Sequence, residues 1–355
     1  MRAVRFHGNR DIRLDEIEEP VCGEGQVKIR PAFVGICGSD LHEYLHGPLS
    51  APTTPHPITG ETLPVTLGHE FSGTVEEVGA GVTRLRVGDR VAVRPNLYDG
   101  TCPACRMGRF NCCRSLGFIG YSGTAGGLSD HVVMKESHAI RLPDTFPLDV
   151  GALVEPLTIA WHAINQSSLK DGDTALVVGG GPIGLAIVQL LRIRGAANII
   201  VTEVSPERQR FARQFGATAV LDPTAVDVVA QVREMTSDAG ADVAFECAGV
   251  QAGLDAAVAG VRVGGTVVLV ALWGEERPRI DAFGIVSQEK RVVGTAICEA
   301  GDMEAVIEVI ASGKLDPRPM ITGTIRMDEV EEKGFKALVK ERDEGVKILV
   351  DVAAV

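Results

Sequence analysis

The 355-residue sequence predicts an α/β fold divided into two domains. Residues 1 to about 155 contain short alternating segments separated by turns rich in Gly and Pro, which is typical of a β-rich domain with long loops. From Asp171 onward, short apolar strands alternate with helical segments. That alternation predicts a doubly wound parallel sheet, covered by helices on both faces.

In the first domain, alternating apolar and polar residues predict strands at 26–30, 74–78 and 90–93. Residues 46–64 are rich in proline and have no periodicity, so they are expected to form a long loop. Loops of this length are commonly functional or mobile.

In the second domain, the predicted strands and helices alternate along the chain. The strands are expected at 174–178, 198–202, 219–221, 243–247 and 266–272, and the helices at 185–194, 206–215, 226–235 and 254–261. A further helix at 302–312 and a strand near 346–350 are expected to return to the first domain. We therefore expect one domain made of residues 1–156 and 299–355, and a second made of residues 157–298.

The net charge of −12 argues against nucleic acid or an anionic membrane surface as a partner. The N-terminus alternates charged and apolar residues, so it resembles neither a signal peptide nor a transit peptide. No apolar run approaches the roughly 18 residues that span a bilayer. We expect a cytoplasmic protein, whose eight cysteines serve as metal ligands or buried small residues rather than as disulfides.

A glycine-rich turn lies between the predicted strand 174–178 and the helix that follows it. Gly179 permits the tight turn, Gly181 lets the backbone approach a pyrophosphate, and Gly184 lets helix and strand pack closely. Pro182 and Ile183 lie within the glycine motif, and the amide hydrogens and positive dipole of the helix that follows favour phosphate. This turn predicts a dinucleotide site, and the alternative is a purely structural turn.

Glu203 stands at the end of the second predicted strand, nineteen residues beyond Gly184 (203 − 184). A carboxylate there accepts hydrogen bonds from ribose hydroxyls and repels a 2′-phosphate, which favours NAD over NADP. Arg208 is close enough in sequence to tolerate a phosphate, so residual use of NADP stays open.

Cys37, His69, Glu70 and Glu155 form the first set of candidate metal ligands. A thiolate, an imidazole and carboxylates suit zinc, and three protein ligands with one open position define a catalytic site. Because these residues are far apart in sequence, spacing alone does not show that they converge. The alternatives are a buried small residue at Cys37, a core histidine at His69 and a helix-terminal carboxylate at Glu155.

A second set is dense: Cys102, Cys105 and Cys113 follow Asp99 within fifteen residues (99 to 113). Closely spaced cysteines in a loop predict a structural tetrahedral zinc site. Cys112 precedes Cys113 directly, so the fourth ligand is ambiguous. The alternative is a reduced loop without metal.

Five segments together resemble the zinc-dependent medium-chain dehydrogenases, and the resemblance covers essentially the whole chain. They are GICGSDLHEY, TLGHEFSGTVEEVG, GDRVAV, VEPLTIAWHA and VVGGGPIGL. Within that family, the proline-rich loop and the stretches LGFIGYSGTAGG and SQEKRVVG are most similar to the 2,3-butanediol (acetoin) dehydrogenases.

The resemblance implies a GroES-like β-rich catalytic domain and a Rossmann domain. It places Cys37, His69 and Glu155 on catalytic zinc, with Glu70 as an alternate or exchanging ligand. The structural zinc would be held by Asp99, Cys102, Cys105 and Cys113. The first of these four positions is normally Cys in the family, so Asp99 puts occupancy of that site in doubt.

The resemblance also implies roles for residues near the substrate and the cofactor. Ser39 and His42 match the family's proton relay, and Val270 and Leu272 are assigned to the cofactor site. The residues expected to line the substrate pocket are Tyr44, Phe118 and Ile119.

The implied reaction is oxidation of a secondary alcohol or vicinal diol to a ketone, with hydride transfer to NAD. Zinc would lower the pKa of the substrate oxygen, and the proton would leave through Ser39, the cofactor ribose and His42. The expected partner is a small diol or hydroxyketone, with (R,R)-2,3-butanediol, acetoin and diacetyl interconverted. Alternatives are a sorbitol-type polyol or L-threonine 3-dehydrogenase, or a zinc-free nucleotide-binding protein.

Assembly into a homodimer or homotetramer is expected by resemblance. The segments 266–272 and 291–297 would pair across a twofold axis and continue the sheet between subunits.

Overall fold

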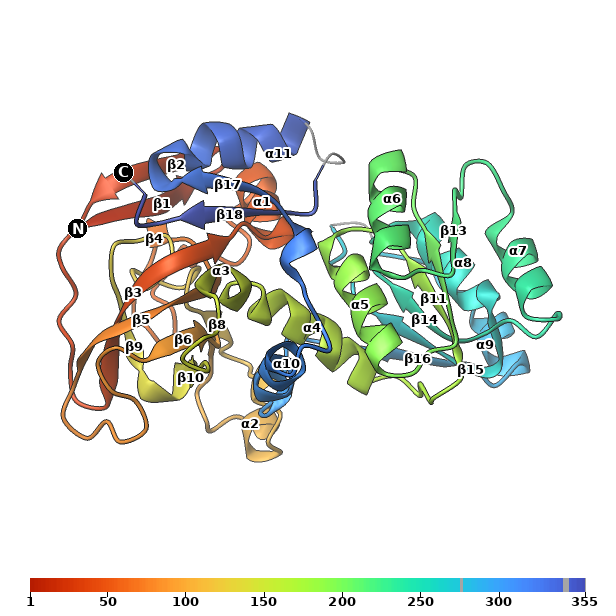
Figure 1. Cartoon of the computed structure of the whole chain (residues 1–355), viewed down its shortest axis with the longest axis horizontal. Coiled ribbons are helices and arrows are strands. Elements are labelled where there is room, and N and C mark those ends of the chain that lie inside the picture. Colours follow the sequence, from red (N-terminus) through yellow and green to blue (C-terminus); the bar gives the residue numbers. More distant parts are fainter. Residues whose placement is uncertain (275–276, 341–344, 355) are drawn as a thin grey trace. The chain divides into compact units, whose positions relative to one another are not determined.

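The computed structural model describes residues 1–274, 277–340 and 345–354. Two units are distinguished: Met1–Glu155 with Glu299–Val355, and Pro156–Cys298 (Figure 1). The first unit is therefore built from two stretches of chain, with the whole second unit inserted between them.

The first unit contains a seven-stranded mixed sheet in the order β10-β6-β5-β3-β18-β17, with β9 paired to β3. Its strands are β3 (Gln26–Gly35), β5 (Glu70–Val78), β6 (Arg90–Val93), β9 (Val132–Lys135), β10 (Ala139–Arg141), β17 (Ile321–Arg326) and β18 (Lys347–Asp351). The pairing of β18 with β3, Leu349 opposite Gly35, joins the C-terminal segment to the N-terminal one. β17 and β18 are parallel, and the other pairs of this sheet are antiparallel.

Two smaller sheets and several helices complete this unit. The sheets consist of β1 (Arg2–Gly8), β2 (Asp11–Glu16) and β4 (Val65–Thr66), and of β7 (Asn96–Leu97) and β8 (Gly117–Phe118). The helices are α1 (Gly38–His46), α2 (Pro103–Arg106), α3 (Leu148–Gly151), α10 (Asp302–Ala311) and α11 (Ala337–Lys340). Apolar side chains of the strands and of residues 327–335 form one buried core, which includes Phe6, Ile29, Phe71 and Phe335.

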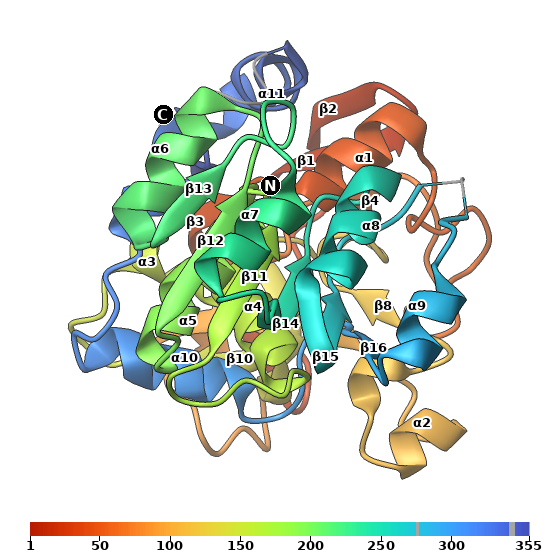
Figure 2. The same ribbon diagram turned by 90° about the vertical axis from the view of Figure 1, so that its right-hand side faces the viewer.

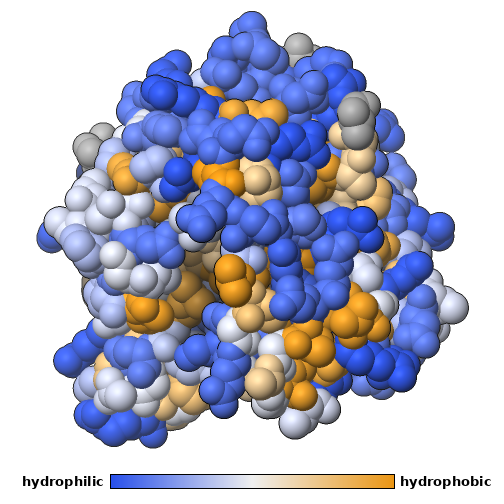
Figure 3. Space-filling view, turned by 90° about the vertical axis from the view of Figure 1, so that its left-hand side faces the viewer, coloured by the Kyte–Doolittle hydropathy of each residue, from blue (hydrophilic) through white to orange (hydrophobic). Residues whose placement is uncertain are grey.

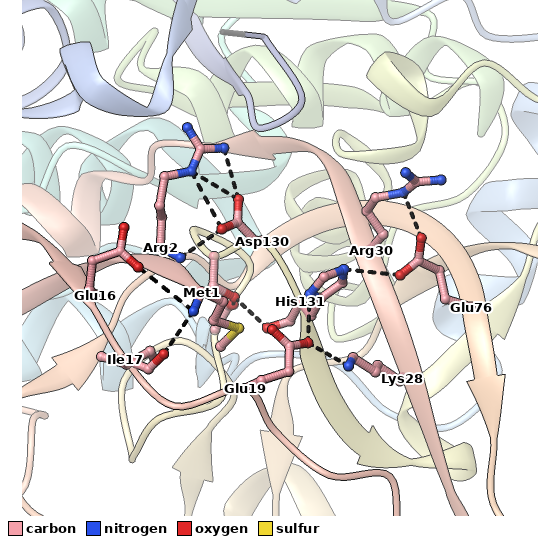
Figure 4. Close-up of polar contacts among 12 residues, drawn as sticks. Met1, Arg2, Glu16, Ile17, Glu19, Lys28, Arg30, Glu76, Asp130 and His131 are labelled. Atoms are coloured by element: carbon pink, nitrogen blue, oxygen red, sulfur yellow. Dashed lines mark hydrogen bonds and ion pairs between the residues drawn. The ribbon is translucent and has the colours of Figure 1, made fainter.

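A network of charged side chains ties the N-terminal segment to β3 and β5 (Figure 4). The two ring nitrogens of His131 lie 2.7 Å from Glu19 Oε1 and 3.0 Å from Glu76 Oε2. Lys28 also contacts Glu19, and Arg30 contacts Glu76 at 3.0 Å. These side chains are partly exposed, so each pair stabilises the fold by about 1 kcal/mol or less.

The side of the molecule that carries both chain termini is mostly hydrophilic, and its hydrophobic residues lie in small separate groups (Figure 3). Scattered apolar residues of this kind are normal on a protein surface. No helix among the described residues has the length and apolar character needed to cross a membrane.

The second unit is a six-stranded, all-parallel sheet in the order β13-β12-β11-β14-β15-β16. Its strands are β11 (Thr174–Val178), β12 (Asn198–Thr202), β13 (Ala219–Leu221), β14 (Ala241–Glu246), β15 (Val261–Leu269) and β16 (Arg291–Gly294). Its helices are α5 (Pro182–Ile193), α6 (Pro206–Phe215), α7 (Val228–Met235), α8 (Gln251–Gly260) and α9 (Ala282–Ser287), and α4 (Val154–Asn165) leads into it. The pair α5 and α6 covers one face, and α7, α8 and α9 cover the other (Figures 1 and 2).

The strand order reverses at β11, which lies between β12 and β14. In open parallel sheets, ligands bind at the carboxyl ends of the strands at such a switch point. The glycine turn Gly179–Gly181 follows β11 directly, so it lies at this position.

Several predicted elements have the observed bounds: the strands 174–178, 198–202 and 219–221 and the helix 206–215. Others differ at their ends. α5 begins at Pro182 rather than at residue 185, because proline is tolerated at the first helical position. β15 ends at Leu269 rather than at residue 272, so Val270 and Leu272 follow the strand. β3 continues to Gly35, beyond the predicted 26–30.

Candidate active site

Cys37, His69 and Glu70 converge because two paired strands bring their backbones together. In the β3–β5 pair, Gly35 lies opposite Glu70. Cys37 follows two residues after the end of β3 and stands at the N-terminus of α1, while His69 directly precedes β5. The Cys37 Sγ, one His69 ring nitrogen and a Glu70 carboxylate oxygen all lie within 4.8 Å of one another.

This donor set fits zinc. Sulfur, imidazole nitrogen and carboxylate oxygen are zinc's usual protein ligands. Burial and the neighbouring Glu70 carboxylate raise the pKa of the Cys37 thiol well above its ordinary range. A bound dication would ionise the thiol, so these residues could hold a zinc ion.

Glu155, the second residue of α4, is buried and lies within electrostatic reach of the same group. Burial raises the pKa of its carboxyl to about 7, His69 opposes this rise, and Glu70 adds to it. Glu155 is outside the set of atoms within 4.8 Å of one another.

Lys347, on β18, was not predicted to take part in the site. The residue is 2% exposed, and its ammonium donates to both carboxylate oxygens of Glu70, at 2.8 and 2.7 Å, and to the carbonyl oxygen of Ile36 at 3.1 Å. Burial works against the charge of Lys347, but Glu70 and Cys37 outweigh it, and the pKa of Lys347 is raised. Glu70 is thus already paired with a cation of the protein.

Gly35 makes this pair possible, because a Cβ at that position would lie 2.2 Å from Glu70 Oε2. Any larger residue would push the carboxylate away from Lys347.

Asp40 contacts both Cys37 and His69, and it was also not predicted as a site residue. Its Oδ2 accepts the Cys37 backbone N–H at 2.8 Å, and its Oδ1 lies 3.5 Å from His69 Nδ1. Tyr121 Oη donates to the same Oδ1 at 2.7 Å. Burial raises the pKa of the Asp40 carboxyl, against the opposing effects of His69 and Tyr121. A carboxylate beside a ligating histidine orients the ring and increases its basicity.

Ser39 and His42, the predicted relay residues, both lie on α1. Ser39 Oγ is 3.0 Å from Tyr121 Oη. The His42 ring lies one helical turn from His46, with 5.1 Å between ring centroids, and His46 is exposed. Ser39 thus contacts the buried cluster through Tyr121, and His42 lies next to an exposed histidine.

Of the three residues expected to line the pocket, Phe118 is next to the site, with its ring edge-on to Tyr121 at 6.4 Å. Ile119 is buried. Tyr44 packs against Phe335 in the core, with 5.3 Å between ring centroids.

Asp99, Cys102, Cys105 and Cys113 come together in the lobe formed by α2 and the 3₁₀ helix Phe110–Cys112. One ligand atom from each lies within 4.8 Å of the others, and the Cys102 Sγ is 3.6 Å from Cys105 and 4.0 Å from Cys113. Cys112 is exposed and is not part of this group. Of the two adjacent cysteines, Cys113 is therefore the one whose sulfur lies with the other three ligand atoms.

The side chains of the lobe have pKa values shifted in both directions. Backbone N–H groups lower the pKa of Cys102 to about 7, whereas burial raises the pKa of Cys105 to about 12. Asp99 Oδ1 accepts the N–H groups of Thr101 and Cys102, at 2.6 and 2.8 Å. These bonds hold the pKa of Asp99 well below its usual range.

The glycine turn after β11 has the close contacts that its motif requires. Gly179 has a φ of 100°, and a Cβ on Gly184 would lie 2.0 Å from the Gly179 carbonyl oxygen. Around Gly181, the N-cap of α5, there is open space for a ligand to approach the backbone, and Pro182 and Ile183 follow in the first turn.

Glu203 directly follows β12 and contacts the glycine turn. Its Oε2 accepts the Gly180 N–H at 2.7 Å, and its Oε1 accepts the Ser205 N–H at 2.8 Å. The backbone N–H of Arg208, in the first turn of α6, donates to the Ser205 hydroxyl at 3.3 Å.

Comparison with known proteins decides the family. Residues 23–144 match the alcohol dehydrogenase GroES-like domain, and residues 182–312 match the zinc-binding dehydrogenase domain. The (R,R)-butanediol dehydrogenase of Bacillus subtilis is 44% identical over 99% of both chains. The chain belongs to the zinc-dependent medium-chain dehydrogenases.

Two further comparisons bear on this medium-chain dehydrogenase. A crystal structure of 2R,3R-butanediol dehydrogenase from Bacillus subtilis is 43% identical, with a TM-score of 0.93 over 99% of both chains. The sorbitol dehydrogenase of the same organism is 32% identical over 99% of this chain and 97% of its own. The expected fold class, the GroES-like and Rossmann domain types and the class of NAD- and zinc-dependent alcohol dehydrogenase are confirmed at the level of the family.

Proposed function

We propose that this dehydrogenase oxidises (R,R)-2,3-butanediol to acetoin with NAD, and catalyses the reverse reductions of acetoin and diacetyl. The observation that carries this proposal is the 44% identity, over the full length, with an (R,R)-butanediol dehydrogenase. The identity with a sorbitol dehydrogenase is lower, 32% over a similar length, so a polyol is the second candidate substrate.

Cys37, His69 and Glu155 would hold the catalytic zinc. The ion pair between Lys347 and Glu70 supports this choice, because a carboxylate that already has a buried cation has less need of a second one. Glu70 is therefore left as the alternate ligand. When bound, the zinc supplies Lewis acidity to the substrate oxygen, as in other zinc alcohol dehydrogenases.

Ser39 would accept the proton of the substrate hydroxyl, and His42 would pass it on toward solvent. The position of both residues on one face of α1, three residues apart, supports this course. A histidine that titrates near neutral pH suits the outer end of a relay.

Gly179, Gly181, Pro182, Ile183 and Gly184 would hold the pyrophosphate at the N-terminus of α5. Glu203 would accept the ribose hydroxyls and favour NAD over NADP. Arg208, Val270 and Leu272 would complete the cofactor site, and Leu272 is 77% exposed in the free protein.

Asp99, Cys102, Cys105 and Cys113 would hold a second, structural zinc. The support is the convergence of all four ligand atoms in one short lobe. An oxygen donor in place of one sulfur makes the set less soft, so this zinc is expected to exchange more readily than one held by four cysteines.

We further propose that the protein is a cytoplasmic homo-oligomer whose dimer forms through the second unit. β16 is an edge strand of the parallel sheet, and exposed strand edges tend to pair. Exposed apolar side chains also occur in this unit, on α9 and in the residues before it: Leu272, Ile280, Phe283 and Val286.

The decisive experiment is a set of initial rates with NAD and with NADP, on (R,R)-2,3-butanediol, its (S,S) and meso isomers, acetoin, sorbitol and L-threonine. A zinc count per subunit accompanies it. The proposal expects the highest kcat/KM on the (R,R) diol with NAD and two zinc ions per subunit. Preference for sorbitol or L-threonine would overturn the substrate assignment and leave the enzyme class intact.

A further inference from the structure

Tyr121 is a buried residue of the site with no role in the mechanism proposed above. It follows β8 in a tight turn, in which its N–H donates to the Phe118 carbonyl oxygen at 3.1 Å. Its ring lies 5.0 Å from the ring of His69, and its side chain is 5% exposed. The residue is therefore almost fully enclosed by protein.

The position of Tyr121 depends on an unusually close approach of two backbones. Gly120 has a φ of 102°, and a Cβ there would lie 2.5 Å from the Gly68 carbonyl oxygen and 2.9 Å from the His69 nitrogen. Gly68 also has a positive φ, of 96°. Only glycine fits such a contact, and it seats the Tyr121 ring directly beside His69.

The hydroxyl of Tyr121 has two oxygen neighbours and a single proton to give. Asp40 Oδ1 is 2.7 Å away and Ser39 Oγ is 3.0 Å away. Both Asp40 oxygens act as acceptors, since Oδ2 takes the Cys37 N–H and Oδ1 faces His69 Nδ1. A hydrogen bond to a carboxylate is the shorter and stronger of the two, so the proton of Tyr121 goes to Asp40.

Ser39 Oγ lies 3.0 Å from the same Tyr121 Oη, so the phenol also fixes the place of the serine hydroxyl. A serine in a proton relay accepts the proton of the substrate alcohol on a lone pair and passes its own proton onward. Its oxygen must therefore be held in place while its own proton stays free to leave.

We infer that Tyr121 is a positioning residue that acts in two directions through one hydroxyl. Toward Ser39, it holds the serine oxygen in place. Toward Asp40, it fixes the carboxylate that lies against the Nδ1 side of the zinc ligand His69. This inference rests on the proposed catalytic zinc and on Ser39 as the proton acceptor.

The test is Tyr121→Phe, which retains the ring beside His69 and Phe118 and removes only the hydroxyl. We expect kcat for (R,R)-2,3-butanediol to fall about 10- to 100-fold, with little change in KM, because groups behind a metal ligand have effects of this size. We also expect zinc to transfer about 10-fold faster to a chromophoric chelator, a readout that needs no substrate. Unchanged kcat and unchanged zinc transfer would overturn the inference.

Tyr98→Phe is the matched control. Its ring stacks on Phe110, with 4.5 Å between ring centroids, and it is partly exposed, so it loses a hydroxyl of the same kind outside the cluster around Cys37. This variant is expected to keep the wild-type kcat and the wild-type transfer rate of the catalytic zinc. A loss equal to that of Tyr121→Phe would show a general effect of phenol removal and would overturn the inference.

A double-mutant cycle with Ser39→Ala separates a positioning role from a purely structural one. If Tyr121 acts on turnover through Ser39, then Tyr121→Phe lowers kcat much less in the Ser39→Ala background than in the wild type. Full additivity would overturn the serine half of the inference. Should Tyr121→Phe fail to fold, as judged by thermal unfolding, Asp40→Asn addresses the same hydrogen bond, and wild-type zinc transfer in that variant would overturn the Asp40 half.

Failure of the proposed function would be distinguishable from failure of this inference. A wild-type protein that oxidises none of the tested alcohols would refute the function. The comparison of zinc transfer between Tyr121→Phe and wild type would still decide the role of Tyr121.

Discussion

At the scale of single residues, the cluster around Cys37 combines predicted and unpredicted members. Cys37, His69 and Glu70 were predicted from their chemistry, and the structure brings their ligand atoms within 4.8 Å. Asp40, Tyr121 and Lys347 were not. Asp40 lies only three residues from Cys37, so its place at the third helical position was a usable signal. Lys347 is 277 residues from Glu70, and no local pattern marks it.

Cys37→Ser should remove the catalytic zinc while leaving the nucleotide site in place. A hydroxyl is a poor replacement for a thiolate toward zinc, so we expect the zinc count to fall by one per subunit and turnover to fall at least about 100-fold. NADH binding, measured by fluorescence titration, should stay close to wild type, because the glycine turn lies in the other unit. Normal turnover in the Cys37→Ser protein would contradict the assignment of this site.

Lys347→Met should destabilise the protein strongly. Removing one partner of a buried pair leaves the other charge uncompensated, which lowers the free energy of unfolding by about 3–5 kcal/mol. Urea unfolding of zinc-stripped protein measures this effect without interference from the metal. The control is Glu70→Gln combined with Lys347→Met. This double variant should recover much of the lost free energy of unfolding, because it no longer buries an uncompensated carboxylate. Equal losses in the single and double variants would contradict this account.

At the scale of elements, the second unit was predicted more closely than the first. Strands such as 174–178 are buried along their whole length and are followed by helices of regular period, so pattern alone defines them. The mixed sheet of the first unit was described only as β-rich. Its order depends on pairings such as β18 with β3, between residues more than 300 positions apart, which local periodicity does not encode.

The lobe around α2 should lose its zinc and part of its stability when one ligand is removed. Cys105→Ser is expected to lower the zinc count from two to one per subunit and the free energy of unfolding by about 3 kcal/mol. Asp99→Cys, by contrast, should retain zinc longer against a chelator, because four thiolates form a softer set. The contrary result would be a wild-type protein with one zinc per subunit that is lost in Cys37→Ser and retained in Cys105→Ser. That result would contradict a structural zinc in this lobe.

The 3₁₀ helix Glu136–His138, between β9 and β10, ends in a histidine that should make the stability of the first unit depend on pH. Burial lowers the pKa of His138, whose Nδ1 is 3.1 Å from the Arg94 carbonyl oxygen. Below about pH 6.5, the ordinary histidine pKa, the unfolded chain binds a proton that the folded protein does not. The stability from neutral His138 is therefore complete above that pH and is lost as the pH falls toward the folded pKa, by up to about 1.4 kcal/mol per pH unit.

His138→Asn keeps a donor for the Arg94 carbonyl and removes the titration. Urea unfolding near neutral pH and again about two units lower should therefore show a smaller difference for His138→Asn than for wild type. An equal difference in both proteins would assign the acid sensitivity to other groups.

At the scale of the whole molecule, the proposed oligomer depends on apolar side chains that a lone subunit leaves in water. Phe283 and Val286 on α9 are 82% and 76% exposed. Large apolar groups gathered beside an edge strand mark an interaction surface. A charged side chain placed among these apolar groups should prevent this surface from being buried against a second copy of the chain.

Phe283→Glu is accordingly expected to shift the protein to monomers in sedimentation or light-scattering measurements. Val21→Glu, at a residue 85% exposed in the first unit, is the control and should leave the assembly unchanged. A Phe283→Glu protein with the wild-type mass would show that the subunits meet elsewhere.

The pairing of Lys347 with Glu70 also bears on the order in which a nascent chain matures. The ribosome delivers β3 and β5 early, and β18 only after the entire nucleotide-binding unit has emerged. Until then Glu70, the first residue of β5, is without Lys347, and its carboxylate favours water over a dry interior. The Glu70–Lys347 pair is thus completed by one of the last strands to be translated, so a stalled or shortened polypeptide would contain the whole nucleotide-binding unit and lack part of the proposed zinc site.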